Sequence, residues 1–288
     1  MIAAILSLSA IYVMLAVGFV IVYRTSHVLN FAHGDVFMVS GYLGFALITT
    51  ISLPPYWALP VSLAGGAISG LLIYAVLMAP MAGHSIFAAV LVTIALGMAI
   101  RGLALVGFKG QVTYPGRILS IEDAPYTIVP GVTLTTIEIL IVLSAIVVMV
   151  ALTLFFRYSP WGIRMRAASQ DPRLAAYRGI NIHAVFAGAW VIASAVAMYA
   201  GTLYSFSKQL SPSLSDVALR GLAVALVGGM DSMKGVVPAA IAVAAIELLV
   251  QRYGSPQMAE AIPFLIVLLV LLIRPWGLFG TKEMIDRI

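Results

Sequence analysis

From Val36 to Ile100 the chain contains no Asp, Glu, Lys or Arg, an uncharged run of 65 residues. A bilayer core takes about 20 helical residues per crossing, so a run of this length must hold several membrane spans. Of all 288 residues, 62% are hydrophobic and 9% are charged, and there is no cysteine to form a disulfide or a thiolate metal site. Soluble domains are about 25% charged. We therefore expect an all-α polytopic transmembrane bundle, with residues 1–288 as a single domain.

Apolar segments that could be membrane spans are separated by Pro, Gly and charged residues. The seventh, Val217–Met230, has only 14 residues and contains Arg220. As a helix it would be about 21 Å long, shorter than a bilayer core of about 30 Å. We expect it to be broken, tilted or re-entrant, so nine crossings and eight crossings with a re-entrant loop remain alternatives. The expected spans are Ile2–Tyr23, Val36–Leu53, Tyr56–Ala79, Ser85–Phe108, Ile137–Phe156, His183–Phe206, Val217–Met230, Val236–Gln251 and Met258–Ile273.

The distribution of Lys and Arg predicts the orientation. The segment Arg157–Arg178 carries five bases against one acid, and basic loops stay in the cytoplasm. Alternation then places Lys109–Thr136, which we expect to be irregular, outside. It also places the N-terminus outside and the tail Arg274–Ile288 in the cytoplasm. This bias accounts for the formal net charge of +5, and no basic stripe with interleaved aromatic residues indicates nucleic-acid binding.

The basic loop, residues 157–181, has the local signals of two short helices with a sharp bend. Pro160 suits the first turn of a helix, where a missing N–H costs nothing. Asp171 followed by Pro172 is typical of a helix N-cap, and Gly179 of a left-handed helix stop. An interfacial helix pair held between two spans would suit the docking of a partner. The alternative is a loop that is basic only because it is cytoplasmic.

A polar interruption follows the first span, from Asn30 to Asp35. Polar groups at membrane depth cost several kcal/mol unless they are paired or hydrated. The alternation of small and polar residues up to Gly34 favours a broken helix beside a cavity, with an ordinary cytoplasmic loop as the alternative. His27 and His33 match no metal-ligand spacing, so we expect no metal site.

Arg101 is predicted to lie inside a membrane span. It is about 10 Å from the outer end at Phe108. Its side chain could extend outward to the surface, or it could serve as a counter-charge inside the bundle, paired with Glu247 or Glu260.

Gly228 and Gly229 form a doublet at the end of the seventh segment. Adjacent glycines allow two backbones to approach closely, or a helix to break at membrane depth. The alternative is a plain glycine-rich turn.

Motifs of catalysis and nucleotide binding are absent from the sequence. There is no Gly-Lys dipeptide and hence no phosphate-binding P-loop, no HExxH and no hydrolase serine elbow. We therefore expect no catalytic residue, no cofactor and no ATPase activity of this chain. If ATP drives its function, another chain must bind the nucleotide.

Four segments in order resemble one family. Asn30–Asp35 (NFAHGD) is similar to its NFAHG(E/D) signature, and Gly162–Asn181 is similar to its GRAIRA…GIN cytoplasmic loop. Leu226–Gly235 and Arg274–Gly280 are similar to its LGG…S…G and RPxGLFG elements. The family is that of the branched-chain amino-acid type permeases of ATP-binding-cassette (ABC) importers, the LivH/LivM kind. The compact length and the NFAHG(E/D) form are most like LivH.

The resemblance implies a helical fold related to the vitamin-B12 importer permeases, in a prokaryotic inner membrane. It implies a second permease subunit (LivM-like) or a second copy of this chain, two cytoplasmic ABC ATPases, and a periplasmic or lipid-anchored substrate-binding protein. It maps the coupling helices onto the basic loop, where the candidate residues are Trp161, Arg164, Arg166, Asp171, Arg173, Arg178 and Gly179. The candidate pathway residues are Asn30, Phe31, His33, Gly34, Asp35, Gly228 and Gly229.

Other functions remain open. The segment Arg24–His27 departs from the small apolar residues usual in the family, so the cargo could be branched-chain amino acids, urea, amides, or aromatic or other small organic acids. An ion-coupled secondary transporter would need intramembrane carboxylates, for which Glu247 and Glu260 are the candidates. An intramembrane enzyme would have only His33 with Asp35, without a Ser or Cys partner.

Overall fold

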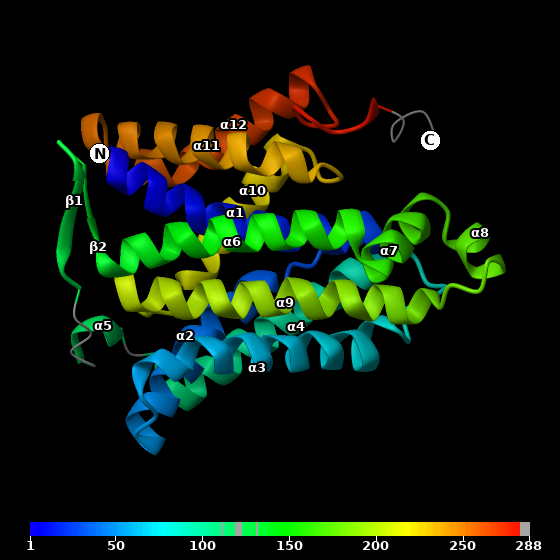
Figure 1. Ribbon diagram of the computed structural model, residues 1–288, viewed down its shortest axis with the longest axis horizontal. Coiled ribbons are helices and arrows are strands. Elements are labelled where there is room, and N and C mark those ends of the chain that lie inside the picture. The colour runs from blue at the N-terminus through cyan, green and yellow to red at the C-terminus, as the bar shows by residue number, and fades with distance from the viewer. Residues whose placement is uncertain (111, 119–122, 131, 283–288) are drawn as a thin grey trace.

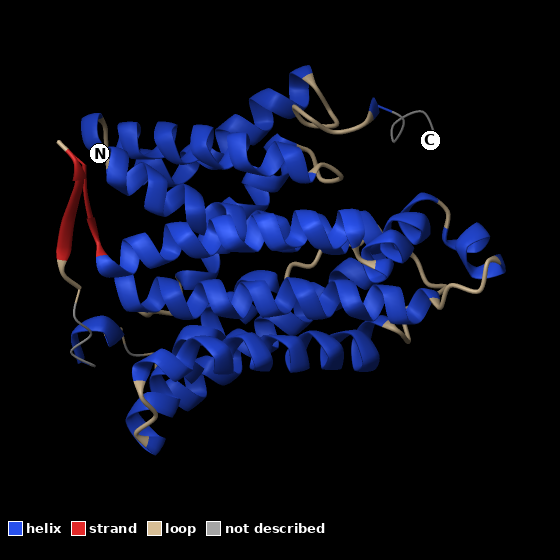
Figure 2. Ribbon diagram, in the orientation of Figure 1, coloured by secondary structure: helices blue, strands red, loops and turns tan. Residues whose placement is uncertain are grey.

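The computed structural model describes all of the chain except residues 111, 119–122, 131 and 283–288. The described part is a bundle of long helices with one small hairpin (Figures 1 and 2). Eight of its helical segments are long and apolar enough to cross a membrane. The expected polytopic helical fold is confirmed, and the last six residues of the expected tail lie outside the described part.

The helix bounds agree with most of the expected segments. The long helices are α1 (Ile2–Ser26), α2 (His33–Ile51), α3 (Ala58–Ile73), α4 (Ile86–Phe108), α6 (Thr136–Tyr158), α9 (Ile182–Ser207), α10 (Leu214–Gly228), α11 (Met233–Tyr253) and α12 (Pro256–Ile273). The short elements are η1 (Pro55–Trp57), η2 (Tyr74–Met78), α5 (Pro115–Ile118), β1 (Pro125–Val129), β2 (Val132–Thr135), α7 (Pro160–Gln170) and α8 (Pro172–Tyr177).

The bundle has two distinct ends (Figure 1). The N-terminus, β1 and β2 lie at one end, which we call the hairpin end. The helices α7 and α8 and the loop after α12 lie at the other, which we call the loop end. This relative placement agrees with the sidedness expected from the charges.

The seventh pass is short, as expected. Its helix, α10, has 15 residues. The chain leaves α9 at the hairpin end, where Leu210 pairs with Thr113, and enters α11 at the loop end. The described chain therefore passes through the bundle nine times, with eight long helices and one short one.

Local sequence explains where several helices begin. Thr135 and Glu138 form a capping box at the start of α6, in which each side chain accepts a hydrogen bond from the other's backbone N–H. Ser85, Asn181 and Ser255 cap α4, α9 and α12 in the same way with a single side-chain acceptor. These caps satisfy N–H groups that the first helical turn leaves free.

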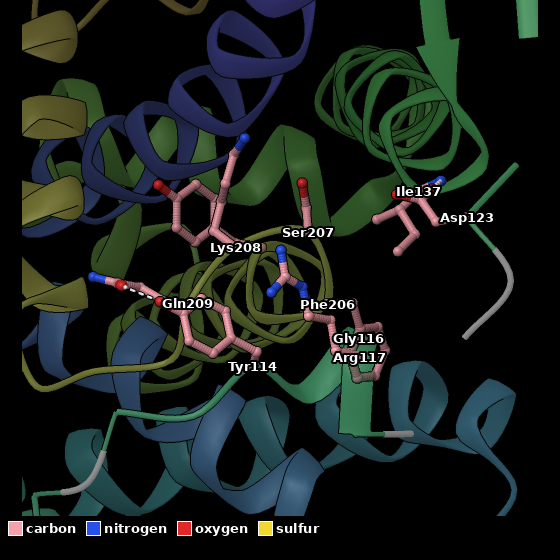
Figure 3. Close-up of a pocket in the computed structure, with 10 residues that line it drawn as sticks. Tyr114, Gly116, Arg117, Asp123, Ile137, Phe206, Ser207, Lys208 and Gln209 are labelled. Carbon is pink, nitrogen blue, oxygen red and sulfur yellow. Dashed lines mark hydrogen bonds between the residues drawn. The ribbon is translucent and has the colours of Figure 1, made fainter. Parts of the chain in front are cut away.

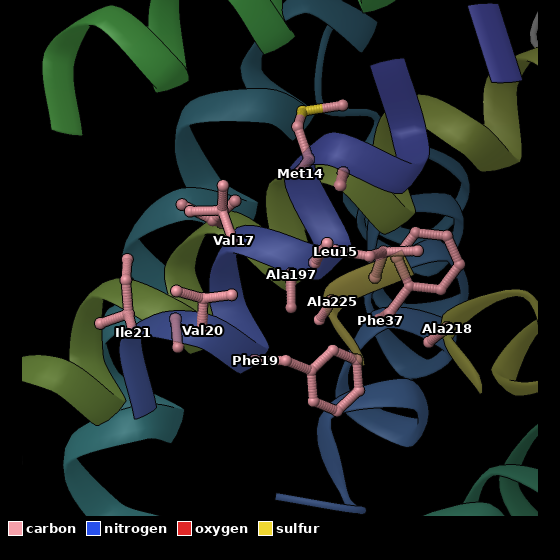
Figure 4. Close-up of a cluster of buried hydrophobic side chains, with 14 of the residues drawn as sticks. Met14, Leu15, Val17, Phe19, Val20, Ile21, Phe37, Ala197, Ala218 and Ala225 are labelled. Atoms are coloured by element: carbon pink, nitrogen blue, oxygen red, sulfur yellow. The ribbon is translucent and has the colours of Figure 1, made fainter. Parts of the chain in front are cut away.

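The core is built around α1. This helix is buried without interruption from Ala10 to Val22. It packs against α6, α9, α10 and α11. The buried cluster around it also includes Phe37 of α2, Ala197 of α9 and Ala225 of α10 (Figure 4). The outward faces of α4, α6 and α12 are exposed and apolar, as lipid-facing or partner-facing helices must be.

The described part of the segment Lys109–Thr136 contains regular elements, so the expectation that the segment is irregular is wrong. It contains α5 and an antiparallel β1–β2 hairpin with a bulge between Thr127 and Val129. β-Branched and aromatic residues dominate both strands, and these residue types favour extended backbone. Pro115 and Gly116 lie within α5 and Pro125 begins β1, so these residues do not prevent the elements from forming.

Candidate functional site

The first candidate site is the break between α1 and α2. Helix α1 ends at Ser26, and His27 closes it in a left-handed conformation with φ 55°. Helix α2 begins at His33, whose imidazole lies against Gly18. Gly18 is eight residues before the end of α1, about 12 Å along the axis. The expected break in this segment is confirmed, and α2 starts inside the bundle.

Contacts from α4 hold the broken segment in place. The backbone N–H of Phe31 donates to Thr93 Oγ1 at 3.1 Å, and the same hydroxyl lies 3.2 Å from the carbonyl oxygen of Leu29. Asn30 is buried, and within the described residues its side-chain amide has no hydrogen-bond partner. Buried amides are normally paired or hydrated, so this position has free capacity to bind a polar group.

Asp35 and Arg101 form an ion pair across α2 and α4. Arg101 Nε lies 2.9 Å from Asp35 Oδ1. Gly97, one turn before Arg101 on α4, makes room for the Asp35 carboxylate. The expectation that Arg101 pairs with Glu247 or Glu260 is therefore wrong. Which helices neighbour α4 depends on tertiary packing, and the residue spacing carried no information on it.

A second charged cluster joins four helices. Tyr12 of α1 donates its hydroxyl proton to Glu247 Oε2 of α11 at 2.6 Å. Arg220 of α10 donates from Nη1 to Glu247 Oε1 at 2.7 Å. Its Nη2 lies 3.7 Å from Glu260 Oε1 of α12. The sequence singled out the two carboxylates and noted Arg220 but missed Tyr12, because nothing in the α1 sequence distinguishes this tyrosine from a core aromatic residue.

The hairpin end is hollowed between α5, α9 and the start of α6. The hollow has a volume of about 900 Å³, and Arg117, Asp123 and Lys208 are its charged lining residues (Figure 3). On its wall the Tyr114 hydroxyl donates to Gln209 Oε1 at 3.2 Å. Lys208 and Gln209 also line a second cavity of about 390 Å³ that reaches α10 and α12. The sequence predicted neither cavity.

The loop end carries the expected pair of short helices, α7 and α8. Ser159 Oγ accepts from Trp161 N at 3.2 Å at the start of α7. Asp171 Oδ1 accepts from the backbone N–H groups of Arg173 and Leu174 at 2.9 and 3.0 Å, which caps α8. Gly179 has φ +79° just after α8. The predicted bend, cap and left-handed stop are thus confirmed.

The outer surface of α7 and α8 combines bases with exposed apolar side chains. Tyr177 is 89% exposed, and the Arg164 guanidinium lies 5.8 Å from the centre of the Trp161 ring. On the opposite side, Gly162 and Met165 of α7 pack against the bundle. The exposed bases and large apolar residues of this surface are Trp161, Ile163, Arg164, Arg166, Arg173, Leu174, Tyr177 and Arg178.

Gly228 and Gly229 lie apart from the α2 break. Gly228 packs against the backbone of Gly235, and Leu278 and Phe279 of the tail donate to the carbonyl oxygens of Val227 and Gly228. The α2 break instead meets α10 near Ala218, about 15 Å away along that helix. The glycine doublet therefore serves close backbone packing between the end of α10 and the tail.

Comparisons with known proteins agree along the whole chain. Residues 1–271 match the family model described as the permease component of branched-chain amino acid transport systems. The chain is 27% identical to LivH, the high-affinity branched-chain amino acid permease protein of Escherichia coli K12, with 96% of this chain and 94% of that protein covered. It is 26% identical to the probable LivH of Methanocaldococcus jannaschii, with 94% and 89% covered.

A solved structure shows a similar fold. PsaBC from Streptococcus pneumoniae, in complex with Fab, aligns over 94% of this chain and 91% of its own chain with a TM-score of 0.50. The two sequences are 14% identical. At this identity the likeness concerns the arrangement of the helices alone.

Proposed function

Since this chain belongs to the family of branched-chain amino acid transport permeases, we propose that it forms half of the translocation pathway of an ABC importer for branched-chain or related amino acids. The observation that carries the proposal is the helix pair α7–α8. It is capped at both starts, anchored on the bundle by Gly162 and Met165, and extends beyond the bundle at the loop end (Figure 1). Such a rigid projection can transmit force to a partner.

The proposed partners of this helix pair are two cytoplasmic ABC ATPases. The exposed arginines with Trp161, Leu174 and Tyr177 supply the aromatic and guanidinium groups that dominate protein interfaces. The sequence has no P-loop, so ATP hydrolysis must come from another chain. A second permease subunit, LivM-like or a second copy, and a periplasmic or lipid-anchored binding protein complete the proposed complex.

The proposed pathway residues are those of the α2 break: Asn30, Phe31, His33, Gly34 and Asp35. The start of a helix inside the bundle, with an unpaired buried amide beside it, is typical of substrate pathways in transporters. Gly228 and Gly229 contribute indirectly in this proposal, because they fix the loop end of α10.

The proposed orientation places the hairpin end outside and the loop end in the cytoplasm of a prokaryotic inner membrane. Five bases against one acid between Arg157 and Arg178 support this choice. The N-terminus is then outside and the tail after α12 is cytoplasmic.

The alternatives concern cargo and energy source. A permease of the same family for urea, amides or small organic acids would share the fold and the coupling helices. An ion-coupled secondary transporter is less well supported, because Glu247 is already paired with Arg220 and Tyr12, and Glu260 also lies 3.7 Å from Arg220.

The test is reconstitution of the complete complex. The tagged chain is purified from its own cells with its bound partners, placed in liposomes and supplied with the binding protein. We expect uptake of labelled leucine that requires ATP, and no ATPase activity from the isolated chain. Uptake by the isolated chain driven by an ion gradient would contradict the proposal.

A further inference from the structure

The smaller cavity at the hairpin end has charged walls of both signs. Its volume of about 390 Å³ lies between the end of α9 and the starts of α10 and α12. Two bases, Lys208 and Arg220, and two acids, Asp216 and Glu260, line it. Small-molecule sites in proteins are about 300–1,000 Å³ in volume and carry a few convergent polar groups on apolar walls.

Arg220 has hydrogen-bonding capacity that the described residues do not use. A guanidinium carries five N–H donors. One nitrogen donates to Glu247 at 2.7 Å, while the other lies 3.7 Å from Glu260, beyond hydrogen-bond range. The side chain is 21% exposed, so the remaining donors can reach a ligand. Glu247 is buried behind it and fixes its position.

Glu260 is an exposed acid on a membrane helix. Its side chain is 72% exposed near the start of α12, in line with the exposed apolar residues Phe264 and Leu268. An ionised carboxylate costs several kcal/mol in lipid, so charged groups on membrane helices face water, protein or a ligand. Glu260 lines the cavity, whose wall also holds Lys208 and Arg220, and Asp216 is exposed at its edge.

We infer that this cavity is a binding site for the zwitterionic head of an α-amino acid, a step that rests on the proposed import function. The ligand's ammonium group faces Glu260 and Asp216, and its carboxylate faces Arg220 and Lys208. The aliphatic side chain lies against Val217, Leu219 and Phe264, which complete the wall. Two bases and two acids match a ligand with one charge of each sign better than they match a simple anion or cation.

The test uses the intact complex without its binding protein, so that only sites on the membrane subunits are measured. Binding of labelled leucine is competed with unlabelled leucine, with 3-methylbutan-1-amine, which lacks the carboxylate, and with 4-methylpentanoate, which lacks the ammonium. The variants are Glu260→Gln and Lys208→Gln. Arg252→Gln is the control, because Arg252 is an exposed base near the same end of α11 and does not line the cavity.

Glu260→Gln should weaken the binding of leucine and of the amine at least tenfold, because one charge-assisted hydrogen bond is lost. The affinity for the carboxylate compound should stay within twofold of the wild-type value. Lys208→Gln should weaken the binding of leucine and of the carboxylate compound and leave the binding of the amine unchanged. Arg252→Gln should change nothing. All variants must elute as intact complexes on size exclusion.

The proposed site would be overturned if both variants bound leucine as tightly as the wild type. It would also be overturned if either variant lost affinity for the amine and for the carboxylate compound equally. Failure of the wild-type complex to import leucine would instead overturn the proposed function. The two failures are therefore distinguishable.

Discussion

Arg220 and Glu247 form an ion pair of 2.7 Å between α10 and α11, inside the bundle and next to the hydroxyl of Tyr12. The pair joins the short seventh helix to a long one. Because Glu247 is buried, its charge depends on this partner. The pair thus stabilises the part of the bundle that carries the proposed amino-acid site.

Replacing Arg220 with Leu should destabilise the protein by about 3–5 kcal/mol, because the buried Glu247 carboxylate loses its counter-charge. The double variant Arg220→Leu/Glu247→Leu should recover much of that loss, since no unpaired charge remains. Thermal unfolding of the purified complex in nanodiscs measures both. Equal stability of the single variant and the wild type would show that the pair is not structural.

A larger residue at position 18 should disturb the start of α2. The His33 imidazole occupies the space beside Gly18, so Gly18→Val overpacks this contact and should cost about 1–3 kcal/mol. Adding His33→Ala should relieve most of the cost. Unfolding temperatures of the two variants and of His33→Ala alone provide the measurement. Additive losses in the double variant would contradict the contact.

Two single-cysteine variants test the orientation, because the native chain has no cysteine. Tyr126→Cys lies in the hairpin, where Tyr126 is 52% exposed, and Tyr177→Cys lies on α8, where Tyr177 is 89% exposed. An impermeant thiol reagent added to intact cells should label the first and not the second. After cells are opened both should react. The reverse pattern would place the hairpin end in the cytoplasm.

Charge reversal on α7 tests the docking surface. The double variant Arg164→Glu/Arg166→Glu should weaken co-purification of the ATPases at low salt. The size of this defect should change with ionic strength. Exposed charges at the edge of an interface interact over the Debye length, which is about 10 Å at 0.1 M salt. Lys109→Glu is the control, because this exposed base caps α4 at the hairpin end. If the same amount of ATPase co-purifies, α7 does not dock on the ATPases and serves only to fix the topology of the chain.

The sequence predicted most of what depends on local chemistry. The helix start at Pro160, the cap at Asp171, the stop at Gly179 and the break before His33 each follow from the residues around them. Long-range partners were not predictable in the same way. Arg101 and Asp35 are 66 positions apart, and Tyr12 and Glu247 are 235 apart. No spacing rule relates such residues, because only tertiary packing decides which helices are neighbours.

The same distinction applies to the candidate sites. The helix pair α7–α8 could be delineated from charge and capping residues alone. The cavity beside Glu260 could not, because it is formed by three helices that meet at the hairpin end. The sequence did not predict the β1–β2 hairpin, because the Pro and Gly residues of this segment indicated turns more strongly than its β-branched residues indicated strands.

In the proposed complex, α7 and α8 transmit the conformational change that accompanies ATP hydrolysis to the transport pathway. The Gly179→Val variant tests this role most directly. Gly179 has φ +79°, and a β-branched residue in that conformation costs at least about 1–2 kcal/mol and should tilt α8. In liposomes containing the complete complex, both leucine uptake and ATP hydrolysis are measured. We predict that uptake falls at least tenfold while the complex stays assembled and accepts the loaded binding protein. If the Gly179→Val complex takes up leucine at the wild-type rate and hydrolyses ATP at an unchanged rate, α7 and α8 do not have this coupling role.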